Sequence, residues 1–322
     1  MHKISPWGIH PNGQAVDLIT LTSSAGAVAE ISNLGGIIRV LEIPLANRTH
    51  RNVVLGYADM AGYLADNSSM GVTVGPYANR IRSGKFTLDG TSYQLEQNEG
   101  ENTLHSGSSG WQNSVYDYEI TGDTLRLTLQ NANGRGGHPG NLAVSVTFRW
   151  SAPLTLEISY AATTDRPTVL SMTHHSYFNL GKQPTILAHT LKMNADSYTP
   201  IDDASLPTGE VVPVAGTTFD FTKTRPIGEH FDHNFALTQG ADVAAVLTSE
   251  EGDLSMTVTT DKPGLQLYTA TNLGAPFQPY GGVCLETQHF PDAPNIPQFP
   301  SAVVTPDKPY QSRTSFTFSE RV

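Results

Sequence analysis

The sequence has only one cysteine, Cys284, in 322 residues. A single thiol cannot form an internal disulfide, which excludes a disulfide framework and is typical of a reducing compartment such as the cytoplasm. Long apolar runs are also lacking. No stretch approaches the roughly 18 apolar residues of a membrane span, and residues 1–8 lack the apolar region of a signal peptide. We therefore expect a cytoplasmic protein that does not enter the membrane.

Basic residues are scarce as well. The chain has 19 Lys and Arg against 30 Asp and Glu, a formal net charge of −11. Nucleic acids and anionic membrane surfaces are bound through clustered Lys and Arg, so neither is expected as a partner. A neutral small molecule suits this charge better. With 38% hydrophobic and 15% charged residues, the composition is that of a globular protein with a sizeable core.

Helical patterns are few, and strand patterns run along the whole chain. Residues 58–65 and 242–248 are the two helix candidates, both short. Asp89-Gly90 predicts a tight hairpin between residues 85–88 and 91–95, because this dipeptide supplies the positive φ angles of a two-residue turn. The other segments with strand patterns are residues 27–31, 36–43, 124–129, 142–150, 154–161, 254–259, 265–271 and 314–318.

Turn residues separate these strands, and we expect residues 254–259 and 265–271 to pair with each other around the turn that joins them. No linker, repeat or low-complexity tract divides the chain, so we expect one continuous domain over residues 1–322. Many antiparallel strands without interleaved helices predict an all-β fold, a large antiparallel β-sandwich or a barrel with few short helices.

One predicted strand near the C-terminus carries an isolated carboxylate. In residues 282–288, Gly-Val-Cys-Leu-Glu-Thr-Gln, alternation puts Cys284 and Glu286 on one face and Val283 and Leu285 on the other. The apolar neighbours predict a partly desolvated Glu286 with a raised pKa, as a general acid or base working near neutrality requires. The alternative is an ordinary glutamate that faces solvent.

Two adjacent histidines lie in residues 168–180, and strand alternation distinguishes them. His175 shares a polar face with Tyr177, whereas His174 falls on a mostly apolar face. His175 is therefore the better candidate for a functional site, and His174 for a core histidine. A core histidine bonded to the backbone is the alternative for His175 as well.

Three further segments offer polar groups that could reach a ligand. His105 lies in a Gly- and Ser-rich loop, although surface histidines in loops are common. Arg80 and Arg82 precede the predicted hairpin and can bind a hydroxyl or a carboxylate; an exposed salt bridge is the alternative, above all for Arg82. Asp232 is crowded between aromatics, which is costly unless it bonds a neighbour or a ligand.

Neither a metal nor a nucleotide cofactor is expected. His230, His233 and Asp232, or the pair His174 and His175, are the candidate metal ligands. However, the helix-borne H-E-x-x-H spacing and a cysteine set are missing, and neighbouring strand residues point apart. No glycine-rich phosphate loop joins a strand to a helix either.

Seven motifs follow one another along most of the chain. They are Asn79-Arg80-Ile81, Asn102-Thr103-Leu104-His105, Gly137-His138-Pro139-Gly140, residues 175–180 (HSYFNL), Pro207-Thr208-Gly209-Glu210, residues 231–235 (FDHNF) and residues 285–292 (LETQHFPD). In this order, and preceded by a Leu34-Gly35-Gly36 turn, they resemble the aldose 1-epimerases, also called galactose mutarotases. The resemblance implies a β-supersandwich with an open cleft that binds a hexose without a cofactor.

The resemblance also implies roles for individual residues. Glu286 would be the general base and His175 the general acid, with His105 assisting at the ring oxygen. The residues implied to bind the sugar are Arg80, Asp232, Asn79 and Tyr177. Three positions depart from the family pattern: Ser106 follows His105 where a glycine is usual, His174 stands where Asn is common, and Pro76 stands where Arg is common. These departures leave the preferred sugar open.

Interconverting two anomers requires one proton to leave the C1 hydroxyl and one to reach the ring oxygen. We expect a Glu286 carboxylate and a His175 imidazolium near its ordinary pKa, facing each other across a hexose-sized gap. The alternatives are a glycoside hydrolase that uses Asp232 and Glu286, and a non-catalytic sugar-binding protein. A phosphorylated sugar is disfavoured because basic residues are scarce. A monomer and a homodimer both stay open, as does the choice among glucose, galactose, arabinose or another aldose.

Overall fold

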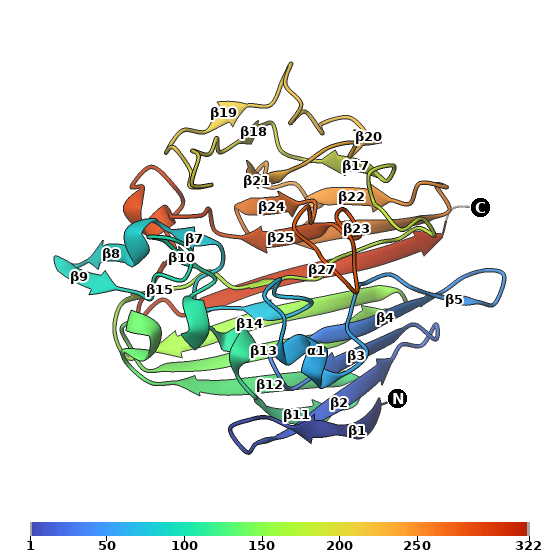
Figure 1. Cartoon of the computed structure of the whole chain (residues 1–322), viewed down its shortest axis with the longest axis horizontal. Coiled ribbons are helices and arrows are strands. Elements are labelled where there is room, and N and C mark those ends of the chain that lie inside the picture. Colours follow the sequence, from blue (N-terminus) through green and yellow to red (C-terminus); the bar gives the residue numbers. More distant parts are fainter. Residues whose placement is uncertain (1, 321–322) are drawn as a thin grey trace.

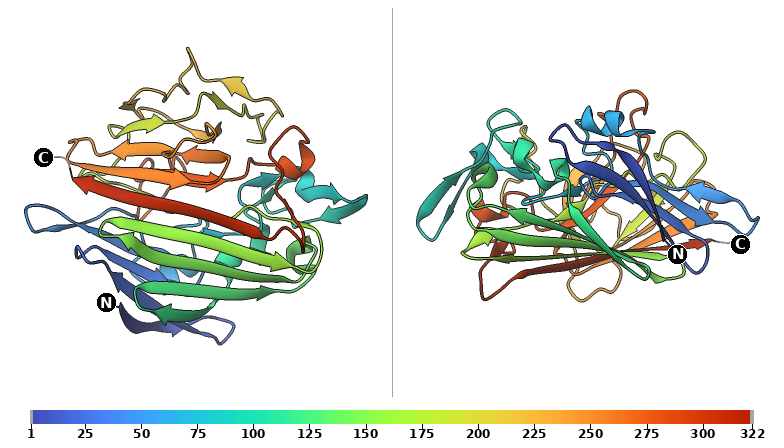
Figure 2. Two further views of the ribbon diagram at one scale, coloured as in Figure 1. Left: turned by 180° about the vertical axis from the view of Figure 1, so that it is seen from behind. Right: turned by 90° about the horizontal axis from the view of Figure 1, so that it is seen from below.

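Two layers of antiparallel β-sheet make up the molecule. The computed structural model describes residues 2–320. A nine-stranded sheet forms one layer, and two five-stranded sheets lie on one side of it, as the two views in Figure 2 show. Within these three sheets all ladders are antiparallel. The predicted all-β fold with few short helices is confirmed.

The nine-stranded sheet crosses the whole molecule (Figure 1). In spatial order its strands are β11 (Asp117–Thr121), β12 (Thr124–Asn131), β13 (Leu142–Ala152), β14 (Thr155–Thr164), β27 (Tyr310–Glu320), β23 (Leu254–Thr260), β22 (Ala245–Thr248), β17 (Thr190–Met193) and β20 (Arg225–Pro226). The last strand of the chain, β27, lies between β14 and β23 and thereby joins the two halves of the sheet.

Two smaller sheets form the other layer. The first contains β1 (His2–Ile9), β2 (Ala15–Thr22), β3 (Val28–Ser32), β4 (Ile38–Pro44) and β5 (His50–Asn52). The second has the order β19 (Val212–Pro213), β18 (Ser197–Tyr198), β21 (Asp232–Ala236), β24 (Gly264–Tyr268) and β25 (Cys284–Gln288). The strand that carries Glu286 is therefore an edge strand of the second small sheet.

Four two-stranded ladders and a few helical turns connect the sheets. The ladders are β7 (Arg80–Ile81) with β10 (Thr103–Leu104), β8 (Lys85–Leu88) with β9 (Thr91–Gln94), β6 (Thr73–Val74) with β16 (Thr173–His174), and β15 (Thr168–Val169) with β26 (Val303–Val304). The helices are α1 (Met60–Leu64) and the single 3-10 turns Arg82–Gly84, Gly107–Ser109, Trp111–Asn113, Arg135–Gly137 and Ala293–Asn295. Among residues 2–320 no helix is long and apolar enough to cross a membrane.

The main hydrophobic core lies between the two layers. Phe148 and Phe316 from the large sheet and Ile19, Leu267 and Leu285 from the small sheets are at most 2% exposed and belong to one cluster. Fully burying one such side chain contributes roughly 1.5–3 kcal/mol. Because Leu285 belongs to this cluster, strand β25 has its apolar face against the core and its other face free for polar groups.

The hairpin expected around Asp89-Gly90 and the short helix expected in residues 58–65 are confirmed. Two other expectations are wrong. β8 and β9 pair around Asp89 and Gly90, whose φ angles of 49° and 77° suit the tight turn. Residues 242–248 are not helical, because Ala245–Thr248 forms β22 between β17 and β23. The segments at 254–259 and 265–271 are strands, but they do not pair: β23 joins the large sheet and β24 the small one.

Candidate active site

Strand β25 presents Glu286 to a cavity. In the ladder with β24, Gln266 lies opposite Glu286 and Tyr268 lies opposite Cys284. Glu286 is 2% exposed, and its Oε2 atom has no hydrogen-bond partner among residues 2–320. Burial raises the pKa of the Glu286 carboxyl to about 8; the nearby Asp232 carboxylate acts in the same direction and Arg80 against it. The prediction of a desolvated glutamate with a raised pKa is confirmed.

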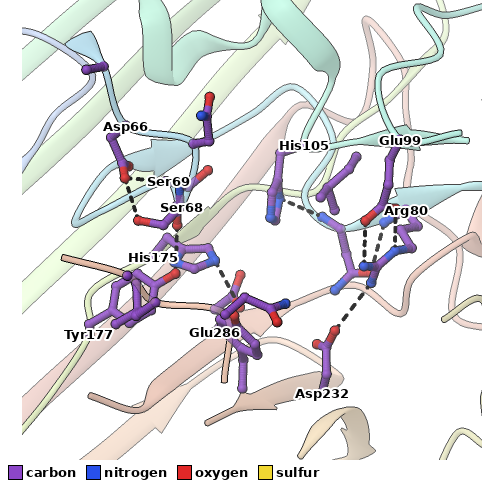
Figure 3. A pocket seen from close by; sticks show the side chains of 18 of the residues that line it. Asp66, Ser68, Ser69, Arg80, Glu99, His105, His175, Tyr177, Asp232 and Glu286 are labelled. Atoms are coloured by element: carbon purple, nitrogen blue, oxygen red, sulfur yellow. Dashed lines mark hydrogen bonds and ion pairs between the residues drawn. The ribbon is translucent and has the colours of Figure 1, made fainter. Parts of the chain in front are cut away.

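His175 faces this carboxyl from the segment that follows β16. Its backbone is fixed on both sides, because His175 N–H donates to the Val72 carbonyl at 2.8 Å and Gly71 N–H donates to the His175 carbonyl at 3.0 Å. The His175 Nε2 atom lies 3.6 Å from Glu286 Oε1 (Figure 3). Burial lowers the pKa of His175 to about 4.

Two details of the expected acid and base pair are wrong. His175 does not keep its ordinary pKa, because it is 4% exposed and burial penalises the charged imidazolium. The two groups are also not separated by a hexose-sized gap, since their nearest atoms are 3.6 Å apart. Between pH 4 and pH 8 the pair therefore holds one proton, on the Glu286 carboxyl rather than on His175.

His105 lies on the other side of His175, with the two ring centroids 5.4 Å apart. Its backbone N–H donates to the Asn79 carbonyl, and the backbone N–H of Asn79 donates to His105 Nδ1 at 3.1 Å. A backbone N–H can only donate, so Nδ1 is the acceptor nitrogen and Nε2 carries the proton of the neutral ring. Burial lowers the pKa of His105 well below its usual value. His105 therefore offers the cavity an uncharged N–H donor.

Arg80 is held in place by two carboxylates. Its Nε and NH2 groups donate to the two oxygens of Glu99 at 2.6 and 2.8 Å, and NH1 lies 3.5 Å from Asp232 Oδ2. Gln266 in turn donates to Asp232 Oδ1 at 2.6 Å. Such a bidentate pair fixes the plane of the guanidinium as well as its position. Asp232 is thereby oriented from two sides, and it comes from β21, two strands from Glu286.

All seven residues proposed from the sequence line one cavity of about 550 Å³. They are Asn79, Arg80, His105, His175, Tyr177, Asp232 and Glu286. Figure 3 shows Glu286 and Asp232 on one wall, Arg80 and His105 on another, and a loop with Asp66 and Ser68 nearby. The Tyr177 hydroxyl donates to the Ser68 carbonyl at 2.7 Å, so this tyrosine joins the loop to the wall that carries His175.

Sequence reasoning missed several residues of this site. Glu99 fixes Arg80 from a loop and carries no local pattern that would have revealed it. Gln266 could have been found, because it is a lone polar residue in the apolar run Leu265–Leu267, and alternation sets it apart from both neighbours. The loop residues Asp66 and Ser68 also line the cavity, and Asp66 accepts hydrogen bonds from Ser68 and from the backbone of Met70.

Other candidates lie outside the cavity lining. Arg82 forms the expected exposed salt bridge, with Asp202 at 3.1 Å. His174 is a buried histidine bonded to the Gly36 carbonyl and to Ser176. None of the three departures from the family pattern lines the cavity, since Ser106 bonds the backbone of Tyr77 and Pro76 accepts the Ser171 backbone N–H.

The candidate metal ligands from the sequence do not come together, but another set does. Within residues 2–320 the group close enough to hold an ion is His105, His175 and Glu286, whose ligand atoms lie within 4.8 Å of one another. Metal binding requires a free lone pair on the coordinating nitrogen. The proton that the Asn79 backbone places on His105 Nε2 opposes such coordination. The absence of a metal remains a prediction.

Comparisons with known proteins agree with this geometry. The family model "Aldose 1-epimerase" matches residues 17–317. The chain is 35% identical to the galactose mutarotase of Mus musculus over 328 residues, which cover 95% of each chain. The chain belongs to the aldose 1-epimerase family. It is also 33% identical to the aldose 1-epimerase of Escherichia coli (strain K12) over 334 residues, 96% of each chain.

Solved structures show the same fold. The GalM/aldose epimerase homologue from C. elegans superposes with a TM-score of 0.92 at 27% sequence identity, over 96% of this chain and all of that chain. Membership of the aldose 1-epimerase family, predicted from seven motifs, is thus confirmed, and so is the galactose mutarotase-like fold. The matched proteins give no support to the alternatives of a glycoside hydrolase or a non-catalytic sugar-binding protein.

Proposed function

We propose that this protein is an aldose 1-epimerase that interconverts the α and β anomers of a free hexose by opening and closing its ring. The observation that carries the proposal is the pair His175 and Glu286, 3.6 Å apart and buried at a polar cavity. The two oxygens that must exchange protons, O1 and the ring oxygen, are bonded to the same carbon. Two proton-transfer groups in near contact can therefore reach both of them from one side of the sugar.

The two groups have complementary roles in ring opening. The Glu286 carboxylate takes the proton of the C1 hydroxyl while His175 Nε2 gives a proton to the ring oxygen, which opens the ring to the aldehyde. After rotation about the C1–C2 bond the same transfers run in reverse and close the other anomer. Free sugars open unaided, so a positioned acid and base that contribute about a hundred-fold each are sufficient.

The proton must first move from Glu286 to His175, because burial favours its place on the carboxyl. This transfer is internal to the pair and requires no proton from solvent. A bound sugar favours it by donating its C1 hydroxyl to the carboxylate, whose buried Oε2 atom has no other hydrogen-bond partner among residues 2–320. The low pKa of His175 then makes the imidazolium a strong acid toward the ring oxygen.

The remaining wall of the cavity supports binding and orientation. Arg80 and Asp232 supply a charged donor and a charged acceptor for sugar hydroxyls, and His105 supplies a neutral N–H donor for the ring oxygen. Asn79 uses its side-chain oxygen to accept the Arg80 backbone N–H at 2.9 Å. We assign Asn79 a role in shaping this wall, and Tyr177 the same role beside His175.

Polarimetry tests the proposal directly. A freshly dissolved α-anomer of glucose or galactose should reach equilibrium faster with enzyme than without. Glu286→Gln should lose at least about a hundred-fold of this acceleration, because the amide cannot take the proton, and should still bind the sugar. Glu119→Gln, an exposed change on β11, is the matched control and should keep full activity. Undiminished catalysis by Glu286→Gln would contradict the assignment of the base.

The proposal also covers the cofactor requirement, domain organisation, location and oligomeric state of the protein. Proton transfer between sugar oxygens consumes no electrons and no phosphate, so we propose that the enzyme needs no cofactor. We propose that residues 1–322 act as one domain, since the site draws on segments from Asn79 to Glu286. A cytoplasmic location and activity as a monomer or homodimer complete the proposal, together with glucose or galactose as the substrate to test first.

A further inference from the structure

His175 is held at both ring nitrogens by side chains of one strand. Nε2 faces Glu286 Oε1 at 3.6 Å, and Nδ1 lies 3.5 Å from Cys284 Sγ, within the reach of a sulfur hydrogen bond. Cys284 and Glu286 are two residues apart in β25 and therefore point to the same face. The strand thus sets the orientation of the imidazole with two side chains, of which only one has a role in the reaction proposed above.

Cys284 is fully buried and cannot touch a sugar in the cavity. Its exposure is 0%, and it is not among the residues that line the cavity. His175 and Glu286, by contrast, both line it. Burial and the neighbouring carboxyls raise the pKa of the Cys284 thiol well above its usual value, so it stays uncharged at any pH at which the enzyme works. Its side-chain hydrogen-bond partner is His175, so we expect an effect of Cys284 on catalysis to act through that ring.

We propose that Cys284 is a positioning residue, whose thiol accepts a hydrogen bond from the Nδ1–H group of His175. This hydrogen bond keeps Nε2 as the nitrogen that exchanges protons with Glu286 and the sugar. The proposal rests on the function proposed above. A thiol is a weak acceptor as well as a weak donor. The Nδ1–H···Sγ contact therefore stays the same whether Nε2 is protonated or not, and only one nitrogen changes its state during a reaction cycle.

An uncharged partner suits a histidine that must act in both directions. In Ser-His-Asp triads a carboxylate fills this position and stabilises the imidazolium. In anomerisation the imidazole gives its proton when the ring opens and takes one when it closes, so a permanently stabilised imidazolium would slow the second half. The thiol favours this tautomer without adding charge, beside the hydrogen bond to the His175 backbone that raises the pKa of the ring.

The test combines a tautomer measurement with steady-state kinetics. Long-range 1H–15N correlation spectra of 15N-histidine-labelled protein, with His175 assigned by its loss in His175→Gln, should show the Nδ1–H form in the wild type. Cys284→Ala should shift His175 toward the Nε2–H form and lower kcat on the order of tenfold, the lower end of the range for removing the outer partner of a metal-binding histidine, with KM nearly unchanged. Cys284→Ser, which keeps a hydroxyl acceptor, should retain the tautomer and most of kcat.

Leu285→Ala is the matched control, because it removes the neighbouring buried side chain of β25 on the opposite face. It should lower the melting temperature while leaving the His175 tautomer unchanged. An unchanged tautomer in Cys284→Ala would overturn the proposal, and so would a changed tautomer with wild-type kcat. The spectra need no turnover, so they decide the role of Cys284 even if wild-type polarimetry were to contradict the proposed function.

Discussion

Arg80 and Glu99 form a bidentate ion pair with N–O distances of 2.6 and 2.8 Å, and Asp232 approaches the same guanidinium from the opposite side. The side chain of Arg80 is 11% exposed and that of Glu99 is 37% exposed, so solvent screens the guanidinium less than the carboxylate. In the proposed function a sugar hydroxyl would meet a cation whose direction is already fixed, and little side-chain entropy would be lost on binding. Several consequences of this site can be measured.

Arg80→Ala should weaken sugar binding more than it slows the chemistry. A hydrogen bond to a charged group is worth roughly 1.5–3 kcal/mol, so we expect KM to rise about tenfold or more, with a smaller change in kcat. Arg82→Ala is the control, because Arg82 is close in sequence but forms an exposed salt bridge outside the cavity lining. Equal effects of the two substitutions on KM would show that Arg80 does not contact the sugar.

The pH profile of kcat/KM should be broad. In the proposed mechanism the site is competent while the pair His175 and Glu286 holds one proton, and the pKa values of about 4 and about 8 place this state between those limits. Below the lower value both groups are protonated and no base remains; above the upper value neither is protonated and no acid remains. With the ordinary values of 6.5 and 4.5 the window would close by pH 6.5. A decline in rate centred near pH 6.5 would contradict the burial argument.

Acid should destabilise the fold before its carboxylates are protonated. Burial lowers the pKa of four histidines to about 4, namely His138, His174, His175 and His189. Between pH 6.5 and pH 4 the unfolded chain binds protons that these rings in the folded state do not, so the free energy of unfolding falls as the pH falls. Each histidine contributes up to about 1.4 kcal/mol per pH unit. Thermal melts at pH 7, 6 and 5 should show a steady decline.

The contribution of one buried histidine to this loss of stability at low pH can be measured separately. His138 has no hydrogen-bond partner at either ring nitrogen among residues 2–320 and lies outside the cavity lining. Replacing it with Phe removes one titrating group, so His138→Phe should show a shallower loss of melting temperature between pH 7 and pH 5. A slope equal to that of the wild type would mean that this histidine does not take part.

Glu286→Gln should be more stable than the wild type at neutral pH. The pKa of Glu286 is raised from 4.5 to about 8, so between these values the unfolded chain ionises the carboxyl while the folded protein keeps the proton. The stability linked to this group is complete below pH 4.5 and is lost as the pH rises toward 8. Gln cannot ionise, so the melting temperatures should coincide at pH 4.5 and diverge at pH 7.5. Equal melting temperatures at both pH values would contradict the raised pKa.

Local patterns predicted those parts of the protein that local geometry decides. Alternation separated His175 from His174 and gave Glu286 and Leu285 opposite faces, as the structure has them. Asp89-Gly90 fixed its hairpin because the positive φ angles belong to the turn itself. The family motifs then selected Arg80 over Arg82, a choice that no periodicity could make.

Features decided by distant parts of the chain were not predictable. Residues 242–248 have an alanine-rich sequence that suits a helix, but their place between β17 and β23 makes Ala245–Thr248 a strand. Strand β24 pairs with β21 and β25 rather than with β23, the strand that precedes it in the sequence. The low pKa of His175 depends on burial by residues that the sequence does not place beside it.

The place of β25 in the sheet has a consequence for how the enzyme loses activity on heating. Leu285 is embedded between the layers, and the residues on either side of it are Glu286, which we propose as the base, and Cys284, whose thiol contacts the imidazole of His175. A shift of one position in the pairing of β25 would turn Cys284 and Glu286 toward the core and Leu285 toward the cavity. Heat inactivation should therefore coincide with unfolding of the whole protein, without a folded and inactive intermediate.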